Sequence, residues 1–336
     1  MAKKIRCAII GYGGMGHFHA AQYGKQKYVE LVAICDTNPE KFKQKEAQIN
    51  LGKSGKSKLD KVQYCASYEA LTSSVEFDML DICLPCPLHA EYAIRAMKDG
   101  YDVLCEKPMA RHSSDAVKMI ETARKTGRKL MIAQCLRFAN NFRKLKEIHD
   151  SGRYGKLLRM DMRRNGGLPK QAWYRDPAQS GGALLDLHLH DTDFIQYLLG
   201  VPDKVMTFGI TRTTGGIDDL MSNYIFADGP KVSSEGSWCR GPWSSGVVAV
   251  FEKATADFCP EGIRICPVDG KEKILKVPSD PNPYFNEIAY FTECIAKKKP
   301  VKICPPESTL LSILIAEAEE KSARTGKMVA VKKPGR

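Results

Sequence analysis

Short apolar runs alternate with helix-like segments through the first 134 residues. The run Ile5–Ile10 is almost continuously apolar and stops at Gly11, and a helix is expected over Met15–Gly24. Val29–Cys35 is a second apolar run, and Pro39 suits the first turn of a helix. A strand buried on both faces has such an unbroken apolar pattern. These patterns predict a parallel sheet covered by helices.

The rest of this half continues the same alternation. Further strands are expected over Val62–Cys65, Met79–Leu84, Val103–Cys105 and Leu130–Ala133, and helices over Pro87–Lys98 and Ser113–Lys125. Ser113 can cap the second of these helices. Alternating strands and helices are typical of a doubly wound, mostly parallel α/β domain.

The second half has a different pattern of expected helices and strands. Helices are expected near Asn141–Ser151, Gly182–Leu199, Tyr284–Lys297 and Glu307–Thr325, and a strand over Leu157–Arg164. Strand-like segments separated by glycine-containing turns fill residues 204–277. This pattern predicts an α+β domain with a large, mostly antiparallel sheet. A chain of 336 residues suits two domains, here residues 1–134 and 135–336.

Charge and composition narrow the function classes. The formal net charge is +12, but the lysines are scattered and lack the interleaved aromatics on which bases stack, so we expect no nucleic-acid partner. No stretch of 18 apolar residues or signal peptide is recognised, so we expect no membrane partner. Of twelve cysteines, several lie in apolar runs, as buried free thiols do, which favours a cytoplasmic protein.

A glycine-rich turn follows the first strand. It is Gly11-Tyr12-Gly13-Gly14-Met15-Gly16, which fits G-x-G-x-x-G and opens a helix. Glycines let the backbone approach a pyrophosphate closely, and the free N–H groups of a helix N-terminus attract its charge. The turn therefore predicts a dinucleotide site.

Asp36 lies twenty residues after Gly16, at the end of the second strand. A carboxylate there can accept hydrogen bonds from a ribose diol and repel a 2′-phosphate, which favours NAD over NADP. A cap or turn role ahead of Pro39 is the alternative, and nearby lysines such as Lys41 leave some NADP use open. The segment Gly52–Ser57 contains Gly-Lys-Ser twice but lacks the preceding glycine of a P-loop, and we interpret it as a basic surface loop.

Further motifs carry a resemblance to a known family. They are Leu84-Pro85-Cys86-Pro87-Leu88-His89, then Cys105-Glu106-Lys107-Pro108, then the segment from Trp173 to Asp193, which contains Asp186-Leu187-His188-Leu189-His190. With the glycine turn, they make the chain resemble the Gfo/Idh/MocA oxidoreductases. The resemblance implies a Rossmann domain, a second domain whose open sheet face forms dimers or tetramers, NAD(P), and a sugar, cyclitol or related polyol as substrate.

The resemblance also implies Lys107, Asp186 and His190 as the catalytic group. A lysine beyond the end of a strand, partly desolvated, can stabilise a developing alkoxide. His190 can exchange a hydroxyl proton near neutral pH, and Asp186, four residues earlier, shares its face of a helix. Asp193 is a candidate to hold the imidazole. A solvated lysine and a structural histidine are the alternatives.

Other residues complete the expected site. Cofactor contacts are expected from the glycine turn, Asp36, Leu84, Pro85, His89, Glu106 and Lys107, and substrate contacts from Arg137, Gln171, Trp173, Asp186, His190 and Tyr284. A structural role for His89 and a salt bridge for Arg137 are fair rivals. His188 stands where the family usually has glycine, and Gln171 where an asparagine is expected, so the substrate's identity is open.

Four rival functions remain. His188 and His190 on a strand would aim at one metal, although on a helix they point apart, and no metal site is predicted. Cys83 and Cys86 form a C-x-x-C that could be a redox pair. The chain could also be a cofactor-binding sensor, or an enzyme that oxidises a glycoside transiently and eliminates its aglycone. The favoured function is NAD-dependent hydride transfer at a ring carbon of a sugar or cyclitol.

Overall fold

The structure is a computed structural model that describes residues 4–44, 48–49, 52–53, 59 and 61–333. Most of the basic segment that the sequence predicts as a surface loop, residues 54–58, lies outside the described residues. The chain divides into two compact units. The first unit contains residues 1–110, 114–135 and 283–309, and the second contains 111–113, 136–282 and 310–336. Residues 283–309, expected in the second domain, therefore belong to the first unit.

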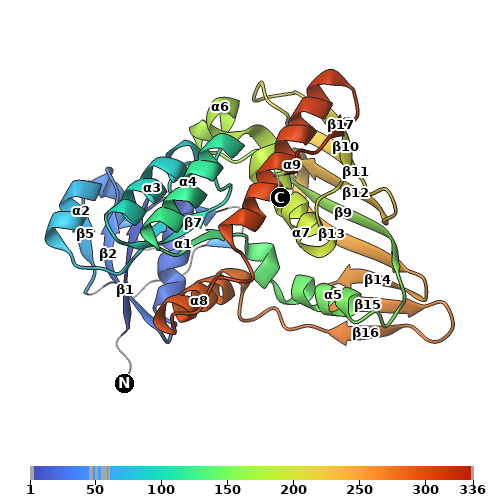
Figure 1. Ribbon diagram of the computed structural model, residues 1–336, viewed down its shortest axis with the longest axis horizontal. Helices are drawn as coiled ribbons and strands as arrows, with labels where there is room; N and C mark the ends of the chain where they lie inside the picture. The colour runs from blue at the N-terminus through green and yellow to red at the C-terminus, as the bar shows by residue number, and fades with distance from the viewer. Residues whose placement is uncertain (1–3, 45–47, 50–51, 54–58, 60, 334–336) are drawn as a thin grey trace. The chain divides into compact units, whose positions relative to one another are not determined.

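The first unit is built on a six-stranded sheet in the order β5-β2-β1-β6-β7-β8 (Figure 1). Its strands are β1 (Ile5–Ile10), β2 (Val29–Cys35), β5 (Gln63–Cys65), β6 (Met79–Ile82), β7 (Asp102–Glu106) and β8 (Leu130–Ala133). Every pairing is parallel. The unbroken apolar runs are explained by burial, since β6 and β8 are buried along their whole length.

Helices cover both faces of this sheet. They are α1 (Gly14–Tyr23), α2 (Tyr68–Ser74), α3 (His89–Lys98), α4 (Ser113–Thr126) and α8 (Pro283–Ala296). The strand order runs outward in opposite directions from β1 and β6, so right-handed crossovers place α1 and α3 on opposite faces. Helix α8 packs against α1, β1 and β8. The helix expected at Pro39 is only a 3₁₀ segment, Pro39–Lys43, and a hairpin of β3 (Gln48–Ile49) and β4 (Gly52–Lys53) follows.

The second unit contains a nine-stranded sheet in the order β16-β15-β14-β13-β9-β12-β11-β10-β17. Its strands are β9 (Leu157–Gly167), β10 (Lys204–Ile210), β11 (Asp219–Ile225), β12 (Lys231–Ser237), β13 (Cys239–Phe251), β14 (Ala254–Cys259), β15 (Gly262–Pro267), β16 (Lys273–Lys276) and β17 (Val329–Ala330). Only β9 and β12 pair in parallel. The predicted combination of a doubly wound parallel sheet and an α+β domain with a mostly antiparallel sheet is confirmed.

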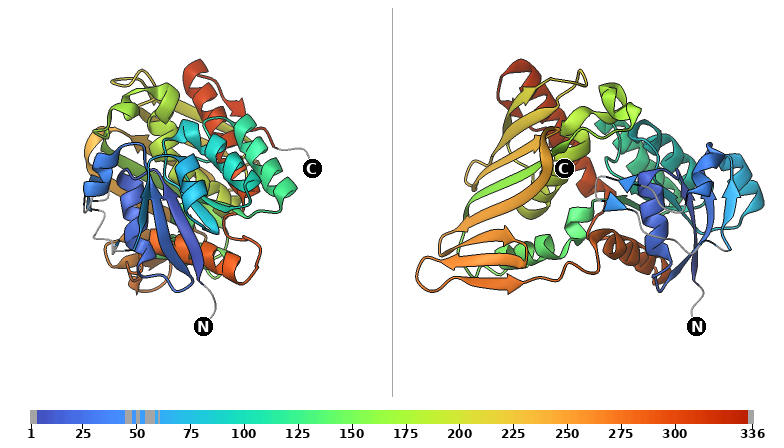
Figure 2. Two further views of the ribbon diagram at one scale, coloured as in Figure 1. Left: turned by 90° about the vertical axis from the view of Figure 1, so that its left-hand side faces the viewer. Right: turned by 180° about the vertical axis from the view of Figure 1, so that it is seen from behind.

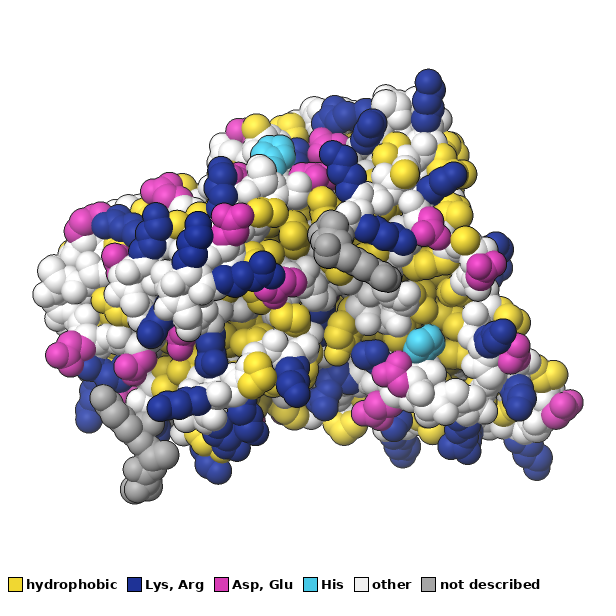
Figure 3. Space-filling view, viewed as in Figure 1, with side chains coloured by type: hydrophobic (Ala, Val, Ile, Leu, Met, Phe, Trp, Pro, Cys, Tyr) yellow, Lys and Arg dark blue, Asp and Glu magenta, His cyan; other side chains and the backbone are white. Residues whose placement is uncertain are grey.

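One face of the large sheet is covered by helices and the other is open (Figures 1 and 2). The covering helices are α5 (Asn140–Asp150), α7 (Leu189–Leu199) and most of α9 (Pro306–Thr325). Apolar side chains remain exposed, including the cross-strand pair Phe208 and Met221, which are 53% and 49% exposed. Lysine and arginine side chains are spread over the surface seen in Figure 3 rather than gathered in one patch.

The helix expected over Gly182–Leu199 is present, but it is not α-helical throughout. A short helix α6 (Pro177–Ser180) ends at Gly181, and the next helix begins at Gly182. The φ angles of these two residues, 72° and 70°, suit glycine. A π-helical segment, Leu184–His188, then leads into α7. π turns are rare and occur frequently at functional sites. None of the helices in the described parts of the chain is long and apolar enough to cross a membrane.

Candidate active site

The glycine turn has the backbone that a dinucleotide requires. Gly11 has φ of +92°, and a side chain there would lie 2.6 Å from the carbonyl oxygen of Cys83. A side chain at Gly16 would overlap the carbonyl oxygen of Gly11. At Gly13, by contrast, an added Cβ would meet nothing within 4 Å. Gly11 and Gly16 thus close the turn, while Gly13 leaves open space at the N-terminus of α1, where a pyrophosphate would fit.

Asp36 is held tightly against this turn. Its carboxylate accepts hydrogen bonds from the backbone N–H groups of Tyr12 at 2.7 Å and Asn38 at 2.9 Å. The Lys41 ammonium lies 2.8 Å from the same carboxylate. The turn role considered as an alternative is therefore present. A carboxylate has about four acceptor sites, so capacity for a ribose hydroxyl remains.

Three predicted cofactor segments meet at one edge of the sheet. The glycine turn follows β1, Leu84 and Pro85 follow β6, and Lys107 follows β7. These strands are neighbours and parallel, so their carboxyl ends share an edge, where β1 is also the point at which the strand order reverses. Ligands of doubly wound sheets bind at such a point.

His89 joins two of these segments. Its ring nitrogens lie 2.7 Å from the carbonyl oxygens of Leu84 and Pro108, which follow β6 and β7. Burial lowers the pKa of His89, although the hydrogen bonds to the two carbonyl groups act to raise it. The structural role is thus observed, and contact of His89 with a cofactor stays a prediction.

Glu106 faces the interior of the first unit. It is buried, one oxygen accepts the backbone N–H of Lys107 at 3.0 Å, and the other lies 3.0 Å from Nε2 of His19. The carboxylate therefore fixes the backbone that presents Lys107. A direct contact of Glu106 with the cofactor stays a prediction.

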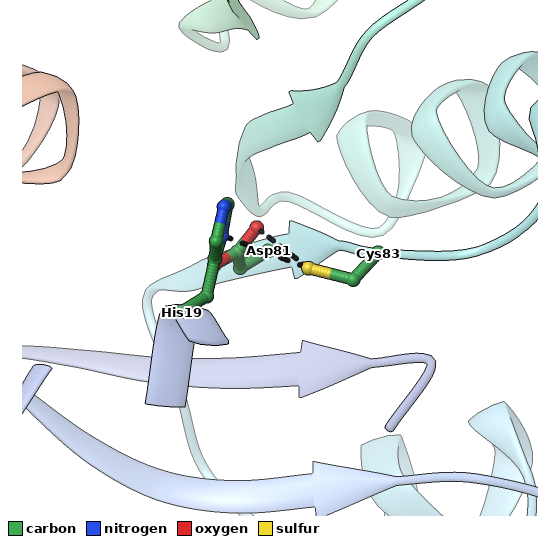
Figure 4. A group of neighbouring side chains, drawn as sticks. All are labelled: His19, Asp81 and Cys83. Atoms are coloured by element: carbon green, nitrogen blue, oxygen red, sulfur yellow. Dashed lines mark hydrogen bonds and ion pairs between the residues drawn. The ribbon is translucent and has the colours of Figure 1, made fainter. Parts of the chain in front are cut away.

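A buried polar cluster around His19 was not predicted from the sequence. Nδ1 of His19 lies 2.8 Å from Asp81 (Figure 4), and the Tyr23 hydroxyl donates to the same carboxylate at 2.7 Å. Glu287 of α8 belongs to the same neighbourhood. The available signal was Asp81, a charged residue inside the apolar run Met79–Leu84.

The C-x-x-C pair does not have the properties of a redox centre. Cys83 lies beside His19 and Asp81, and burial raises the pKa of its thiol (Figure 4). Neither Cys83 nor Cys86 forms a disulfide. Redox pairs need a thiolate with a lowered pKa, so the structure disfavours this alternative.

The second unit presents Asp186 and His190 at the helix junction. Asp186 lies in the π segment, His190 lies in the first turn of α7, and both are partly exposed. The buried His188 between them has a different environment, since its Nε2 lies 3.0 Å from the Tyr224 hydroxyl and 3.1 Å from Glu319. His188 thus has its own buried partners, an arrangement unlike a paired metal site.

Space for His188 comes from a glycine on the facing strand. A Cβ on Gly236 of β12 would lie 2.8 Å from Cβ of His188. The ring that stands in place of the family's usual glycine is therefore accommodated by a second glycine in the sheet. This pairing explains how the chain tolerates its departure from the family pattern.

Asp193 and Arg137 pair with each other in the second unit. Both oxygens of Asp193 bond the Arg137 guanidinium, at 2.7 and 2.8 Å, and Ser312 donates to the same carboxylate. Asp193 is thus held by Arg137 and Ser312, and a contact of Asp193 with His190 stays a prediction. The salt bridge considered as the rival role of Arg137 is present and buried, and substrate contact by Arg137 stays a prediction.

The remaining substrate candidates have varied surroundings. Gln171 is exposed ahead of a 3₁₀ turn, Ala172–Arg175, and Trp173 stacks on Tyr174 with ring centroids 3.8 Å apart. Tyr284 begins α8 in the first unit, packs edge-to-face on Phe18, and has a pKa raised by burial. Their substrate roles stay predictions.

Two family models match the chain. Residues 5–134 match the Gfo/Idh/MocA oxidoreductase family, NAD-binding Rossmann fold, and residues 142–256 match the Gfo/Idh/MocA C-terminal domain. The chain belongs to the Gfo/Idh/MocA family. The resemblance stated from the sequence is confirmed, and so is the NAD-binding Rossmann domain.

Two of the relatives are named as dehydrogenases of a glucoside and of an inositol. The chain is 32% identical to D-glucoside 3-dehydrogenase of Escherichia coli over 202 residues, which are 59% of this chain and 55% of that protein. It is 28% identical to myo-inositol 2-dehydrogenase of Thermotoga maritima over 206 residues, 58% and 55% respectively. The chain thus spans about half the length of these relatives.

Solved structures share the fold. Levoglucosan dehydrogenase in complex with NADH and levoglucosan superposes with a TM-score of 0.86 at 18% identity, covering 98% of this chain and 100% of that one. At this identity the likeness establishes the architecture of the chain and leaves its substrate to be inferred.

Proposed function

We propose that this Gfo/Idh/MocA chain is an NAD-dependent dehydrogenase that acts on a ring CH–OH of a sugar or cyclitol. The observation that carries the proposal is the glycine turn. A side chain at Gly11 or Gly16 would collide with backbone atoms, whereas a side chain at Gly13 would meet nothing within 4 Å. Lys107 lies at the same sheet edge as this turn. The names of the glucoside and inositol dehydrogenases support the substrate class.

The chain's own residues divide the chemistry. Bound NAD would supply a hydride acceptor at its nicotinamide ring. Lys107 hydrogen-bonds the reacting oxygen and stabilises negative charge on it. His190 removes the hydroxyl proton, and Asp186 contacts a neighbouring hydroxyl or orients the group. Glu106 and His89 hold the strand ends that present Lys107 and the Leu84–Pro85 segment.

NAD is the preferred dinucleotide in this proposal. Asp36 is buried against the turn and retains acceptor capacity for a ribose diol, while its charge repels a 2′-phosphate. Lys41 pairs with Asp36 and reduces that repulsion, so we expect NADP to bind weakly rather than not at all.

Two further observations support our proposals for assembly and location. The open sheet face, with Phe208 and Met221 exposed on it, supports a homo-oligomer, a dimer or tetramer, since apolar patches mark such interfaces. None of the twelve cysteines forms a disulfide, which supports the reducing cytoplasm as the location.

The test is a substrate panel. Purified protein is incubated with NAD and, in turn, with inositols, aldoses and glycosides, while NADH formation is followed by absorbance. We expect NADH to accumulate with at least one cyclic polyol. Release of an aglycone without net NADH would indicate the transient-oxidation alternative. Dinucleotide binding with no change in any compound of the panel would indicate the sensor.

A further inference from the structure

Three unpaired ligand atoms converge inside the first unit. Nε2 of His19, Oε1 of Glu106 and an oxygen of Glu287 lie within 4.8 Å of one another. Each of these atoms is buried and has no hydrogen-bond partner among the described residues, and both oxygens of Glu287 share this property. Buried polar groups are nearly always satisfied, so a cluster of unsatisfied ones indicates a missing ligand.

The contact between His19 and Glu106 has the wrong direction for a hydrogen bond. Nε2 of His19 and Oε1 of Glu106 are 3.0 Å apart, yet the pair does not meet hydrogen-bond geometry. Because Nδ1 of His19 faces Asp81, a neutral ring that donates there presents a lone pair from Nε2. A metal ion on the axis of that lone pair would also be within reach of Oε1 of Glu106, which lies off this axis.

The groups that hold the candidate ligands in place resemble those behind metal ligands. A histidine that ligates a metal almost always donates its other N–H to a carboxylate, as His19 can to Asp81. The second oxygen of Glu106 is fixed by the Lys107 N–H. Ligand atoms 2.0–2.2 Å from one Zn²⁺ lie about 3–4 Å apart, so the observed spacing needs only a small contraction.

The charges of the cluster also favour a bound cation. Asp81, Glu106 and Glu287 are buried around one imidazole, so carboxylates outnumber cations in the cluster. Glu287 is 0% exposed, and neither of its carboxyl oxygens has a hydrogen-bond partner among the described residues. A divalent cation would supply the missing positive charge.

A neighbouring set of ligand types is already satisfied. Asp81 is bonded by His19 and Tyr23, and the Cys83 thiol lies 3.6 Å from both His19 and Asp81 (Figure 4). His19, Asp81 and Cys83 therefore form a hydrogen-bonded group, and the unsatisfied atoms lie on the other side of the imidazole.

We propose that His19, Glu106 and Glu287 bind one divalent transition-metal ion, with Zn²⁺ the best match to one imidazole and two carboxylates. The ion joins helix α1, the end of β7 and helix α8. It is structural, since all three ligands are buried, and it fastens a helix from the end of the chain to the Rossmann sheet. The proposal does not depend on the substrate or on the catalytic roles given above.

The test measures metal in the full-length chain without a histidine tag. Protein from medium supplied with Zn²⁺, Mn²⁺ and Fe²⁺ is analysed by elemental mass spectrometry, with about one ion per chain expected. Glu287→Gln keeps the shape of the side chain and should lower occupancy at least about tenfold. Glu293→Gln, on the same helix but paired with Lys297, is the matched control and should retain the ion.

Thermal unfolding supplies a second readout. A strong chelator should lower the melting temperature of the wild type and Glu293→Gln, added Zn²⁺ should restore it, and Glu287→Gln should not respond. Wild-type protein with less than about a tenth of an ion per chain, no uptake on dialysis against each metal, and no response to chelator would overturn the proposal. Full occupancy in Glu287→Gln would overturn the ligand assignment. If Glu287→Gln does not fold, the metal content and the chelator response of the wild type still decide the proposal.

Discussion

The glycine turn of the first unit and the histidine junction of the second are both short motifs, but different residues determine their backbones. In the turn, the constraint is local: Gly16 must pack against the carbonyl of Gly11. At the junction, Leu184–His188 is π-helical and His188 is fixed by Gly236 and Glu319, which are distant in sequence. The backbone of a motif with a local constraint can be predicted from the sequence. For a motif that depends on distant partners, the sequence predicts which residues take part but not their backbone conformation.

The largest expected effect tests whether both regions serve one reaction. Lys107→Ala in the first unit and His190→Ala in the second should each lower kcat about 10²–10⁴-fold, because each removes a group that handles charge or a proton at the reacting oxygen. NADH affinity, measured by fluorescence titration, should remain. Lys98→Ala and His149→Ala, on α3 and α5, are the controls. Near-normal turnover in either test variant would remove that residue from the mechanism.

Two glycines of the turn should separate folding from cofactor binding. Gly16→Ala should lower the free energy of unfolding by about 3 kcal/mol or more, because its Cβ would overlap the Gly11 carbonyl. Gly13→Ala should leave stability unchanged and weaken NADH binding at least about tenfold, since its Cβ meets only the ligand. Thermal unfolding and NADH titration measure both. Unaltered NADH affinity in Gly13→Ala would show that the pyrophosphate binds elsewhere.

The stability of the junction should depend on pH through the protonation of Glu319. Burial acts to raise its pKa, but the charge of His188 and hydrogen bonds from His188 and Tyr224 outweigh burial, so the pKa is lowered. The resulting stability is present above the unfolded pKa of about 4.3 and is lost as pH falls through the lowered folded value. Glu319→Gln should cost about 3 kcal/mol at neutral pH and lose less stability on acidification.

Denaturant unfolding at several pH values would measure this effect. Glu235→Gln, which removes an exposed partner of Arg240, is the control and should behave as wild type. An acid response in Glu319→Gln equal to that of the wild type would contradict this account of the junction.

Gly236 should reveal whether the facing strand shapes the junction. Gly236→Ala places a Cβ 2.8 Å from His188 and should destabilise the protein by about 1–3 kcal/mol through overpacking. Gly167→Ala, another strand glycine whose Cβ would meet nothing within 4 Å, should be nearly neutral. Equal stabilities of the two variants, measured by thermal unfolding, would show that His188 has room to move.

The smallest expected effect concerns cofactor choice. Asp36→Ser should narrow the preference for NAD over NADP about tenfold, because the carboxylate that repels a 2′-phosphate is lost and Lys41 is released. The ratio of kcat/KM for the two cofactors measures it. A ratio that does not change would place the ribose contact at another residue.

The parallel sheet was the most predictable part of the molecule. Ile5–Ile10 and Val29–Cys35 are strands with the expected bounds, because burial of most of their residues on both faces leaves a nearly continuous apolar pattern. The expected helix at Pro39 became only Pro39–Lys43, in which the structure buries no residue and which therefore gains little from packing. The membership of α8 in the first unit could not be predicted, since it depends on contacts with α1, β1 and β8.

The sequence indicated which residues belong to the candidate site, but not which of their side chains pair with one another. Gly11, Gly16 and Asp36 lie as expected at the end of their strands. The partner of Asp193 proved to be Arg137, and Glu106 turned inward to His19, because buried charges pair with whatever the tertiary fold brings near. Sequence spacing carries no information about such long-range pairs.

The most direct measurement is a titration of NADH with purified wild-type protein, repeated with NADPH. The account predicts saturable binding of one NADH per chain with a dissociation constant below about 1 mM, weaker binding of NADPH, and loss of affinity in Gly13→Ala. Absence of binding by either dinucleotide, or equal affinity in the wild type and Gly13→Ala, would contradict it.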